Sequence, residues 1–229
     1  MNPPTAPDGL AERLASVQER VADAARAAGR SPAELTTIVV TKFHPSSLVR
    51  ELVSLGVGDV GENRAQEAAM KASETADLAV RWHFIGQLQT NKAKQVRRFA
   101  SAVHSIDRAA LVDALGARDG VLDCFVQLNL TDDPARGGID REGLVPLAER
   151  VLQTPGLRLR GVMAVAPIGE EPRRAFARVR EASDALRRIA PDADAISAGM
   201  SGDFEDAIAE GATHLRLGTA ITGKRPDHA

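Results

Sequence analysis

Two groups of residues, one near each end of the chain, have side chains and spacing suited to chemistry. Lys42 ends a short apolar run at 36–43, and a lysine amine can attack a carbonyl carbon to form a Schiff base. Far along the chain, the segments 199–203 (GMSGD) and 216–220 (RLGTA) each place a glycine beside a hydroxyl residue. Backbone N–H groups and hydroxyls in such turns form an anion cradle. The two groups predict a carbonyl-reactive amine and an anion-binding turn.

Alternation along the first apolar run predicts where Lys42 points. In a strand, Ile38, Val40 and Lys42 share one face. If the first two fill a barrel interior, Lys42 points into its upper mouth, and partial desolvation there lowers the pKa of its amine. The alternative is a lysine at a strand end that extends to solvent or pairs with a carboxylate.

The second group has both a structural and a functional interpretation. Ser201 is predicted as the N-cap of a helix at 203–210, a common task for serine, and Asp203 could satisfy backbone donors nearby. Arg216 shares strand parity with His214 and Gly218, so it points inward and needs a partner. That partner is a carboxylate, as in a buried salt bridge, a phosphate or a ring nitrogen.

Three other residues are weaker candidates. Asn63 follows the second apolar run, and His83, in the third, either lines the mouth or packs beside Trp82. Cys124 lies in an apolar run and is interpreted as a core residue. The chain has no HExxH, CxxC, P-loop or G-x-S-x-G pattern, so no metal site is predicted.

The elements that must position these residues alternate between strands and helices. Helical spacing at 10–28 comes first, and each later apolar run except the last precedes a helical segment. Such alternation implies parallel strands, and eight of them predict a single (β/α)8 TIM-type barrel with an additional N-terminal helix. A doubly wound open sheet is the second possibility. The predicted strands are 36–43, 59–62, 81–86, 102–107, 123–130, 157–167, 195–200 and 214–220.

Composition narrows the class of protein. The chain has 229 residues, 44% of them hydrophobic, which suits one barrel domain at 10–229 after a flexible segment at 1–9. Lys+Arg total 29 against 31 for Asp+Glu, so neither a nucleic-acid nor a membrane-surface binder is expected. A single cysteine, no membrane-length apolar run and no secretory signal predict a cytoplasmic location.

Several segments together resemble one family, the pyridoxal phosphate homeostasis proteins, which bind pyridoxal 5'-phosphate (PLP) in a single barrel. The matching stretches span nearly the whole chain in the family's order, and the QxNK and GMSxD…RxGTA patterns are highly specific. They are VVTKFHP (39–45), GENRAQEA (61–68), WHFIGQLQTNK (82–92), HSIDR (104–108), VQLNL (126–130), LRGVMAVAP (159–167) and the block at 199–225.

The resemblance implies a fold like the N-terminal barrel of alanine racemase and a set of roles. It implies that Lys42 forms the internal aldimine with PLP, that Arg216 faces the pyridine nitrogen and that Asn63 lies near the ring. The phosphate ligands that it implies are Ser201, Gly218 and Thr219. It also implies that the protein buffers or delivers PLP to apo-enzymes without substantial turnover, and we expect a monomer.

Elementary chemistry agrees with a non-catalytic role. An arginine at the pyridine nitrogen keeps that nitrogen unprotonated and makes the ring a poorer electron sink. A racemase of the alanine-racemase type also uses a tyrosine, and this chain has none. Two alternatives stay open: a weak PLP enzyme, racemase or dehydratase, with His83 as second acid/base, and a cofactor-free Schiff-base aldolase using Lys42. The chain departs from many relatives at Arg136, where they carry a lysine, and in TKFHP, where SKTKP is commoner.

Overall fold

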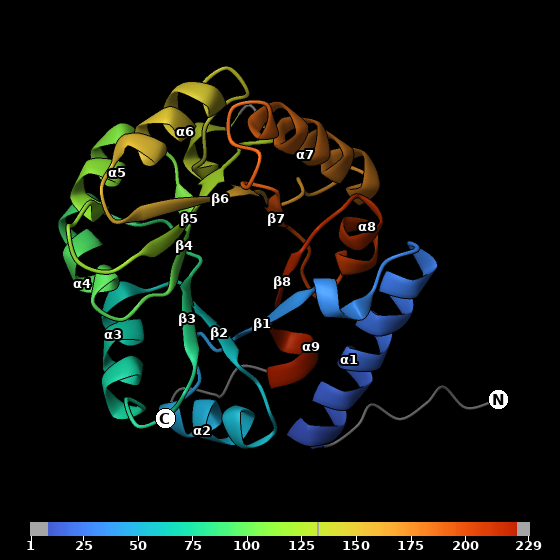
Figure 1. Cartoon of the computed structure of the whole chain (residues 1–229). Helices are drawn as coiled ribbons and strands as arrows, with labels where there is room; N and C mark the ends of the chain where they lie inside the picture. Colours follow the sequence, from blue (N-terminus) through green and yellow to red (C-terminus); the bar gives the residue numbers. More distant parts are fainter. Residues whose placement is uncertain (1–8, 132, 224–229) are drawn as a thin grey trace.

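Eight parallel strands close into a barrel in chain order, and helices surround it (Figure 1). The computed structural model describes residues 9–131 and 133–223. The last strand pairs with the first in the register Thr36↔His214 and Ile38↔Arg216, which closes the ring. The predicted (β/α)8 barrel is therefore confirmed, and the doubly wound open sheet is wrong. The strands are β1 (Thr36–Val40), β2 (Asp59–Glu62), β3 (Arg81–Phe84), β4 (Ala102–Ile106), β5 (Leu122–Gln127), β6 (Leu157–Met163), β7 (Ala195–Ser197) and β8 (His214–Leu217).

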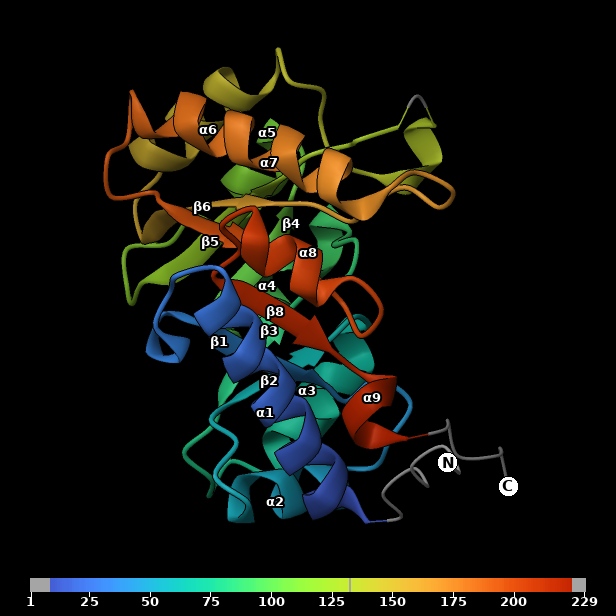
Figure 2. The same cartoon turned by 90° about the vertical axis from the view of Figure 1, so that its right-hand side faces the viewer.

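The helices follow the predicted alternation. The additional N-terminal helix, α1, lies beside α8 and α9 in both views of the molecule (Figures 1 and 2). Arg13 of α1 donates from Nε to the carbonyl oxygen of Ile221 at 2.8 Å, which ties this helix to the end of the barrel sequence. The helices are α1 (Leu10–Ala27), α2 (Ser46–Ser54), α3 (Ala65–Glu74), α4 (Ala93–Arg97), α5 (Ala109–Leu115), α6 (Leu144–Gln153), α7 (Pro172–Arg187), α8 (Phe204–Ala209) and α9 (Thr219–Thr222); the 3-10 helices are Pro32–Glu34, Thr90–Lys92 and Pro134–Arg136.

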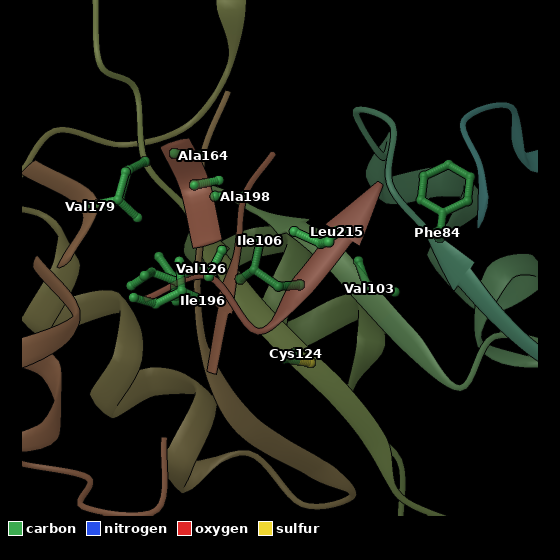
Figure 3. Close-up of a cluster of buried hydrophobic side chains, with 14 of the residues drawn as sticks. Phe84, Val103, Ile106, Cys124, Val126, Ala164, Val179, Ile196, Ala198 and Leu215 are labelled. Carbon is green, nitrogen blue, oxygen red and sulfur yellow. The ribbon is translucent and has the colours of Figure 1, made fainter. Parts of the chain in front are cut away.

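The main hydrophobic core lies between the strands and the surrounding helices (Figure 3). Because strand side chains alternate, one set of residues points out to the helices and includes Val103, Val126 and Leu215, all fully buried. The other set points into the barrel. There, Phe125 and Met163 form a smaller apolar cluster with two alanines.

Element ends differ from the sequence prediction at two places that concern the site. The first strand ends at Val40, not at residue 43, because a turn follows it. The N–H of His44 donates to the carbonyl oxygen of Thr41 at 3.1 Å, and Phe43 within this turn has φ of 70°. The last strand ends at Leu217, and residues 219–222 form the unpredicted short helix α9. The expected flexible segment at 1–9 lies outside the described residues, except for Gly9. Among the described helices, none is both long and apolar enough to span a membrane.

Candidate functional site

The predicted site residues lie at the carboxyl ends of four adjacent strands. Around the barrel the order is β7, β8, β1 and β2. Ser201 follows the first of these strands, Gly218 and Thr219 follow the second, Lys42 follows the third and Asn63 follows the fourth. Residues separated by up to 177 positions in sequence are thus gathered at one mouth of the barrel, where such folds carry their functional groups.

Lys42 lies two residues beyond the end of β1, and its side chain is exposed. The prediction of a partly desolvated amine is therefore wrong, because the strand ends two residues earlier and Lys42 is exposed. The prediction for the preceding residues is confirmed, since Ile38 and Val40 face Gly61 inside the barrel. The Lys42 ammonium lies 5.8 Å from the centre of the Phe43 ring.

A buried lysine, Lys71 of α3, holds the loop that carries Lys42. Its Nζ donates to the carbonyl oxygen of Thr41 at 2.9 Å and to Oε1 of both Glu62 and Glu67 at 2.7 Å. Glu67 Oε1 also accepts from the backbone N–H of Phe43 at 2.8 Å. The residues before and after Lys42 are therefore both bound to one ionic cluster, which sustains the unusual φ of Phe43.

The two carboxylates of this cluster have opposite pKa shifts. Burial raises the pKa of Glu62 above its usual value, and the hydrogen bonds from Lys71 and Thr41 oppose that shift. Burial acts in the same direction on Glu67, but the Lys71 and Phe43 hydrogen bonds outweigh it and lower the pKa. The difference follows from exposure, because the Glu62 side chain is 0% exposed and that of Glu67 is 20% exposed.

The two glycine-containing turns meet. Ser201 Oγ accepts from the backbone N–H of Ala220 at 3.5 Å, a long and therefore weak contact. The prediction that Ser201 caps α8 is wrong: the N-cap is Asp203, and its carboxylate accepts from the N–H of Met200 at 2.6 Å. Asp203 thus satisfies a backbone donor as anticipated. It leaves the Ser201 hydroxyl beside the first turn of α9.

Arg216 is buried inside the barrel and binds two neutral acceptors. Nη1 donates to Ser197 Oγ at 2.7 Å and Nη2 to the carbonyl oxygen of Ala164 at 2.9 Å. No carboxylate of residues 9–131 or 133–223 forms an ion pair with it. Burial lowers the pKa of Arg216 to about 10, with Asp203 opposing, so the guanidinium is charged at neutral pH. The buried salt bridge considered from the sequence is not present in the described structure.

Asn63 presents a buried acceptor with no hydrogen-bond partner in the described structure, its Oδ1. The residue lines a cavity of about 630 Å³ together with Phe84 and Gln87. Gly86 lies against its backbone: a Cβ at that position would be 2.3 Å from the Asn63 carbonyl oxygen. Close approach of the two loops therefore depends on glycine.

His83 and Cys124 are not in this site. His83 lines a different cavity, of about 480 Å³, with the first residues of β1, β2 and β8, which places it toward the amino-terminal mouth. The idea that it lines the upper mouth is wrong, and both of its ring nitrogens have partners. Cys124 is fully buried, as predicted, and burial raises the pKa of its thiol to about 12.

The chemistry of these donors fits an aromatic aldehyde that carries a phosphate. An exposed amine can reach a carbonyl carbon, and a buried guanidinium without a carboxylate can face a ring nitrogen. Hydroxyls and helix-start amides can receive a phosphate. The Oδ1 of Asn63 is one more buried polar atom without a partner in the described structure. The cavity that Asn63 lines is not lined by Lys42, Ser201 or Arg216.

The fold and these residues define a class, the alanine racemase N-terminal barrels: the model of that domain matches residues 13–226. The chain is 42% identical to a pyridoxal phosphate homeostasis protein of Pseudomonas aeruginosa over 94% of this chain and 96% of the relative. It is 38% identical to the protein of that name from Escherichia coli, over 94% and 97%. The chain belongs to the pyridoxal phosphate homeostasis protein family.

A solved structure supports this assignment. The structure of PipY from Synechococcus elongatus with PLP bound superposes with a TM-score of 0.80 at 34% identity, and the match covers 94% of this chain and all of that one.

The ionic cluster under the Lys42 loop, formed by Lys71, Glu62 and Glu67, was not predicted from the sequence. Two signals for it were present. Glu67 and Lys71 have the i, i+4 spacing of a helical ion pair, and Glu62 has the strand parity of a helix-facing residue, where a charge needs a partner.

Proposed function

We propose that this protein binds PLP through an imine bond between Lys42 Nζ and the aldehyde carbon, and takes part in intracellular PLP homeostasis by storing and delivering the cofactor. The bond forms when the neutral amine attacks the aldehyde and the carbonyl oxygen leaves as water, and hydrolysis reverses it. A reversible covalent bond to an aldehyde suits a carrier, because it lowers the free concentration of a reactive compound without consuming it.

Each site residue has one task in this proposal. Lys42 anchors the aldehyde, Arg216 donates to the ring nitrogen, and Asn63 contacts the ring region. The phosphate is received by Ser201, Gly218 and Thr219. Lys71 holds the loop on both sides of Lys42 through Thr41 and Phe43.

One observation carries the proposal: an arginine buried without a carboxylate partner in the described structure lies on the strand between the Lys42 loop and the Ser201 turn. A buried guanidinium that has only neutral acceptors retains strong donor capacity. A ring nitrogen that accepts a hydrogen bond uses this capacity, and a protonated ring nitrogen would place two positive charges together. The site therefore favours the unprotonated ring, which is a poor electron sink.

The proposal assigns no substantial turnover to this site. A weak racemase or dehydratase would need an acid/base group facing Lys42, and both ring nitrogens of His83 are engaged, Nε2 by Asp59 and Nδ1 by His104. The proposal further assigns a cytoplasmic location, PLP-dependent apo-enzymes as recipients, a monomeric state, and one PLP-binding domain over 10–229.

The experiment that tests this function is a PLP titration followed by transfer. The purified protein should develop an imine absorption band with one equivalent of PLP, and Lys42→Ala should not. The loaded protein should then activate an apo-form of a PLP enzyme more slowly than free PLP does, because the imine bond to Lys42 must be broken before or during transfer. A protein that takes up no PLP would contradict the proposal and favour the cofactor-free lysine enzyme.

A further inference from the structure

A chain of hydrogen-bonded polar side chains runs through the interior of the barrel from Asp59 to Arg216. Asp59 is the first residue of β2, and Arg216 lies near the end of β8. Between them every contact is short. Asp59 Oδ1 lies 2.8 Å from His83 Nε2, His83 Nδ1 lies 2.9 Å from His104 Nε2, His104 Nδ1 lies 2.8 Å from Ser197 Oγ, and Ser197 Oγ lies 2.7 Å from Arg216 Nη1.

The two ends determine the direction of the bonds between them. A guanidinium only donates and a carboxylate only accepts. Ser197 therefore accepts from Arg216 and can donate its own hydrogen to His104 Nδ1. His104 then carries its proton on Nε2 and donates to His83 Nδ1, and His83 donates from Nε2 to Asp59. Ser197, His104 and His83, the three side chains between the ends, each make one donation and one acceptance along the series.

The reverse arrangement is less favourable for Ser197. If His104 donated from Nδ1, Ser197 Oγ would accept two hydrogen bonds and its hydroxyl hydrogen would need another acceptor. Ser197 is 0% exposed, and the described structure offers that hydrogen no other side-chain partner. A buried donor without an acceptor is costly, so the arrangement directed from Arg216 to Asp59 is preferred.

The surroundings favour a neutral His104 and an ionised Asp59. Burial first, and then the neighbouring His83, His214 and Arg216, lower the pKa of His104 well below its usual value. Its ring stacks on Phe125 with centres 4.3 Å apart and planes at 14°. Burial would raise the pKa of Asp59, but hydrogen bonds from His83 and Arg81 lower it on balance.

We propose that Ser197 and His104 are positioning residues for Arg216, and that His83 and Asp59 keep the His104 tautomer in which this support is possible. The inference rests on the proposed function, in which Arg216 faces the ring nitrogen of PLP. Ser197 Oγ accepts a hydrogen bond from Nη1 of Arg216 and the Ala164 carbonyl oxygen accepts one from Nη2, and together they fix the orientation of the guanidinium plane. The plane of a guanidinium decides where its other donors point, so losing Ser197 releases the contact with the ring nitrogen.

The first arm of the test uses the protein without cofactor. Nitrogen-15 NMR of the histidine side chains at pH 7 should show His83 and His104 as neutral Nε2–H tautomers. An Nδ1–H tautomer or a doubly protonated ring at His104 would contradict the proposed direction of the hydrogen bonds from Arg216 to Asp59. This NMR measurement needs no variant and no PLP. Its result therefore tests the direction of the hydrogen bonds independently of the proposed function.

The second arm compares PLP with its 1-deaza analogue, in which a CH group replaces the ring nitrogen. Ser197→Ala should weaken PLP binding about tenfold, the effect of one hydrogen bond to a charged group, and leave binding of the deaza analogue within about twofold. The matched control is His214→Asn. The ring centre of His214 lies 6.3 Å from that of His104, and its Nδ1 is hydrogen-bonded to Thr213, which is not part of the series from Asp59 to Arg216.

The outcomes separate the two claims. Equal weakening of both ligands by Ser197→Ala would show a general structural role and overturn the positioning claim. Unchanged PLP binding in Ser197→Ala would also overturn it, while the proposed function would stand. A wild-type protein that binds neither ligand would defeat the proposed function itself.

Discussion

Lys71 Nζ lies 2.9 Å from the carbonyl oxygen of Thr41, the residue immediately before the proposed cofactor lysine. The side chain of Lys71 is only 2% exposed, and it reaches this carbonyl from α3 between two carboxylates. A buried lysine thus supports an exposed one. Its charge is balanced within the cluster, and the loop is held from both sides of Lys42.

Replacing Lys71 with Met should lower the free energy of unfolding by about 3–5 kcal/mol, because two carboxylates lose their cation, and one of them is fully buried. Urea denaturation measures this change. The matched control is Lys94→Met, which removes an exposed lysine from α4 and should change stability by less than about 0.5 kcal/mol. Equal effects of the two substitutions would contradict the account of the cluster.

Replacing Gly86 with Ala should disturb the site through its backbone. The new Cβ would lie 2.3 Å from the Asn63 carbonyl oxygen, so the loops after β2 and β3 must move apart. We expect a loss of about 1–3 kcal/mol in stability and weaker PLP binding. Gly58→Ala is the control, since a Cβ there meets nothing within 4 Å. Wild-type PLP affinity in Gly86→Ala would show that the position of Asn63 is unimportant.

Replacing Ser201 with Ala should act only on ligands that carry a phosphate. With the described residues the hydroxyl makes one weak contact, at 3.5 Å, so the substitution should hardly alter stability. PLP affinity should fall about tenfold, while the affinity for pyridoxal, which lacks the phosphate, should stay the same. Paired titrations with the two ligands measure this difference. An equal loss for both would place Ser201 away from the phosphate.

Stability should decline as the pH falls from about 6.5 toward 4. Burial, together with His83 and Arg160, lowers the pKa of His214 to about 4, from 6.5. The unfolded chain therefore binds a proton in this range that the folded chain excludes, and His214 contributes a slope of up to about 1.4 kcal/mol per pH unit. The raised pKa of Glu62 acts in the opposite direction at the acid end.

Unfolding in urea at several pH values measures this decline, and the comparison with His214→Asn isolates one histidine. The variant should show a shallower decline between pH 6.5 and 4. Identical pH profiles would mean that His214 titrates alike in both states. Above pH 7 the two proteins should keep a constant difference in stability.

Much of the fold could be predicted from the sequence, because strand runs and helical runs alternate with distinct periodicities. The alternation of side chains along a strand also predicted correctly that Ile38 and Val40 point into the barrel interior. The end of β1 could not be predicted, since it depends on the positive φ of Phe43 and on a lysine 28 residues beyond that phenylalanine. The helix α9 was missed because a four-residue helix has too little periodicity to detect.

The sequence predicted which residues form the candidate site, but it did not predict the contacts that hold these residues in place. Ser201 looked like a helix cap because serine is common there, and only the structure shows that Asp203 takes that position. The hydrogen-bonded series from Asp59 to Arg216 joins five strands, and no local pattern connects His83 with His104 or Ser197. Such contacts follow from closure of the barrel, which brings interior residues of distant strands together.

The central claim is that Lys42 carries the cofactor, and reductive trapping tests it most directly. The protein is mixed with one equivalent of PLP, reduced with borohydride and digested, and the modified peptide is identified by mass spectrometry. Lys92, which lines the cavity beside Asn63, is the lysine to compare with Lys42. We expect a phosphopyridoxyl group on Lys42 in the wild type and in Lys92→Ala, and none in Lys42→Ala. A group trapped on Lys92, or on no lysine, would contradict it.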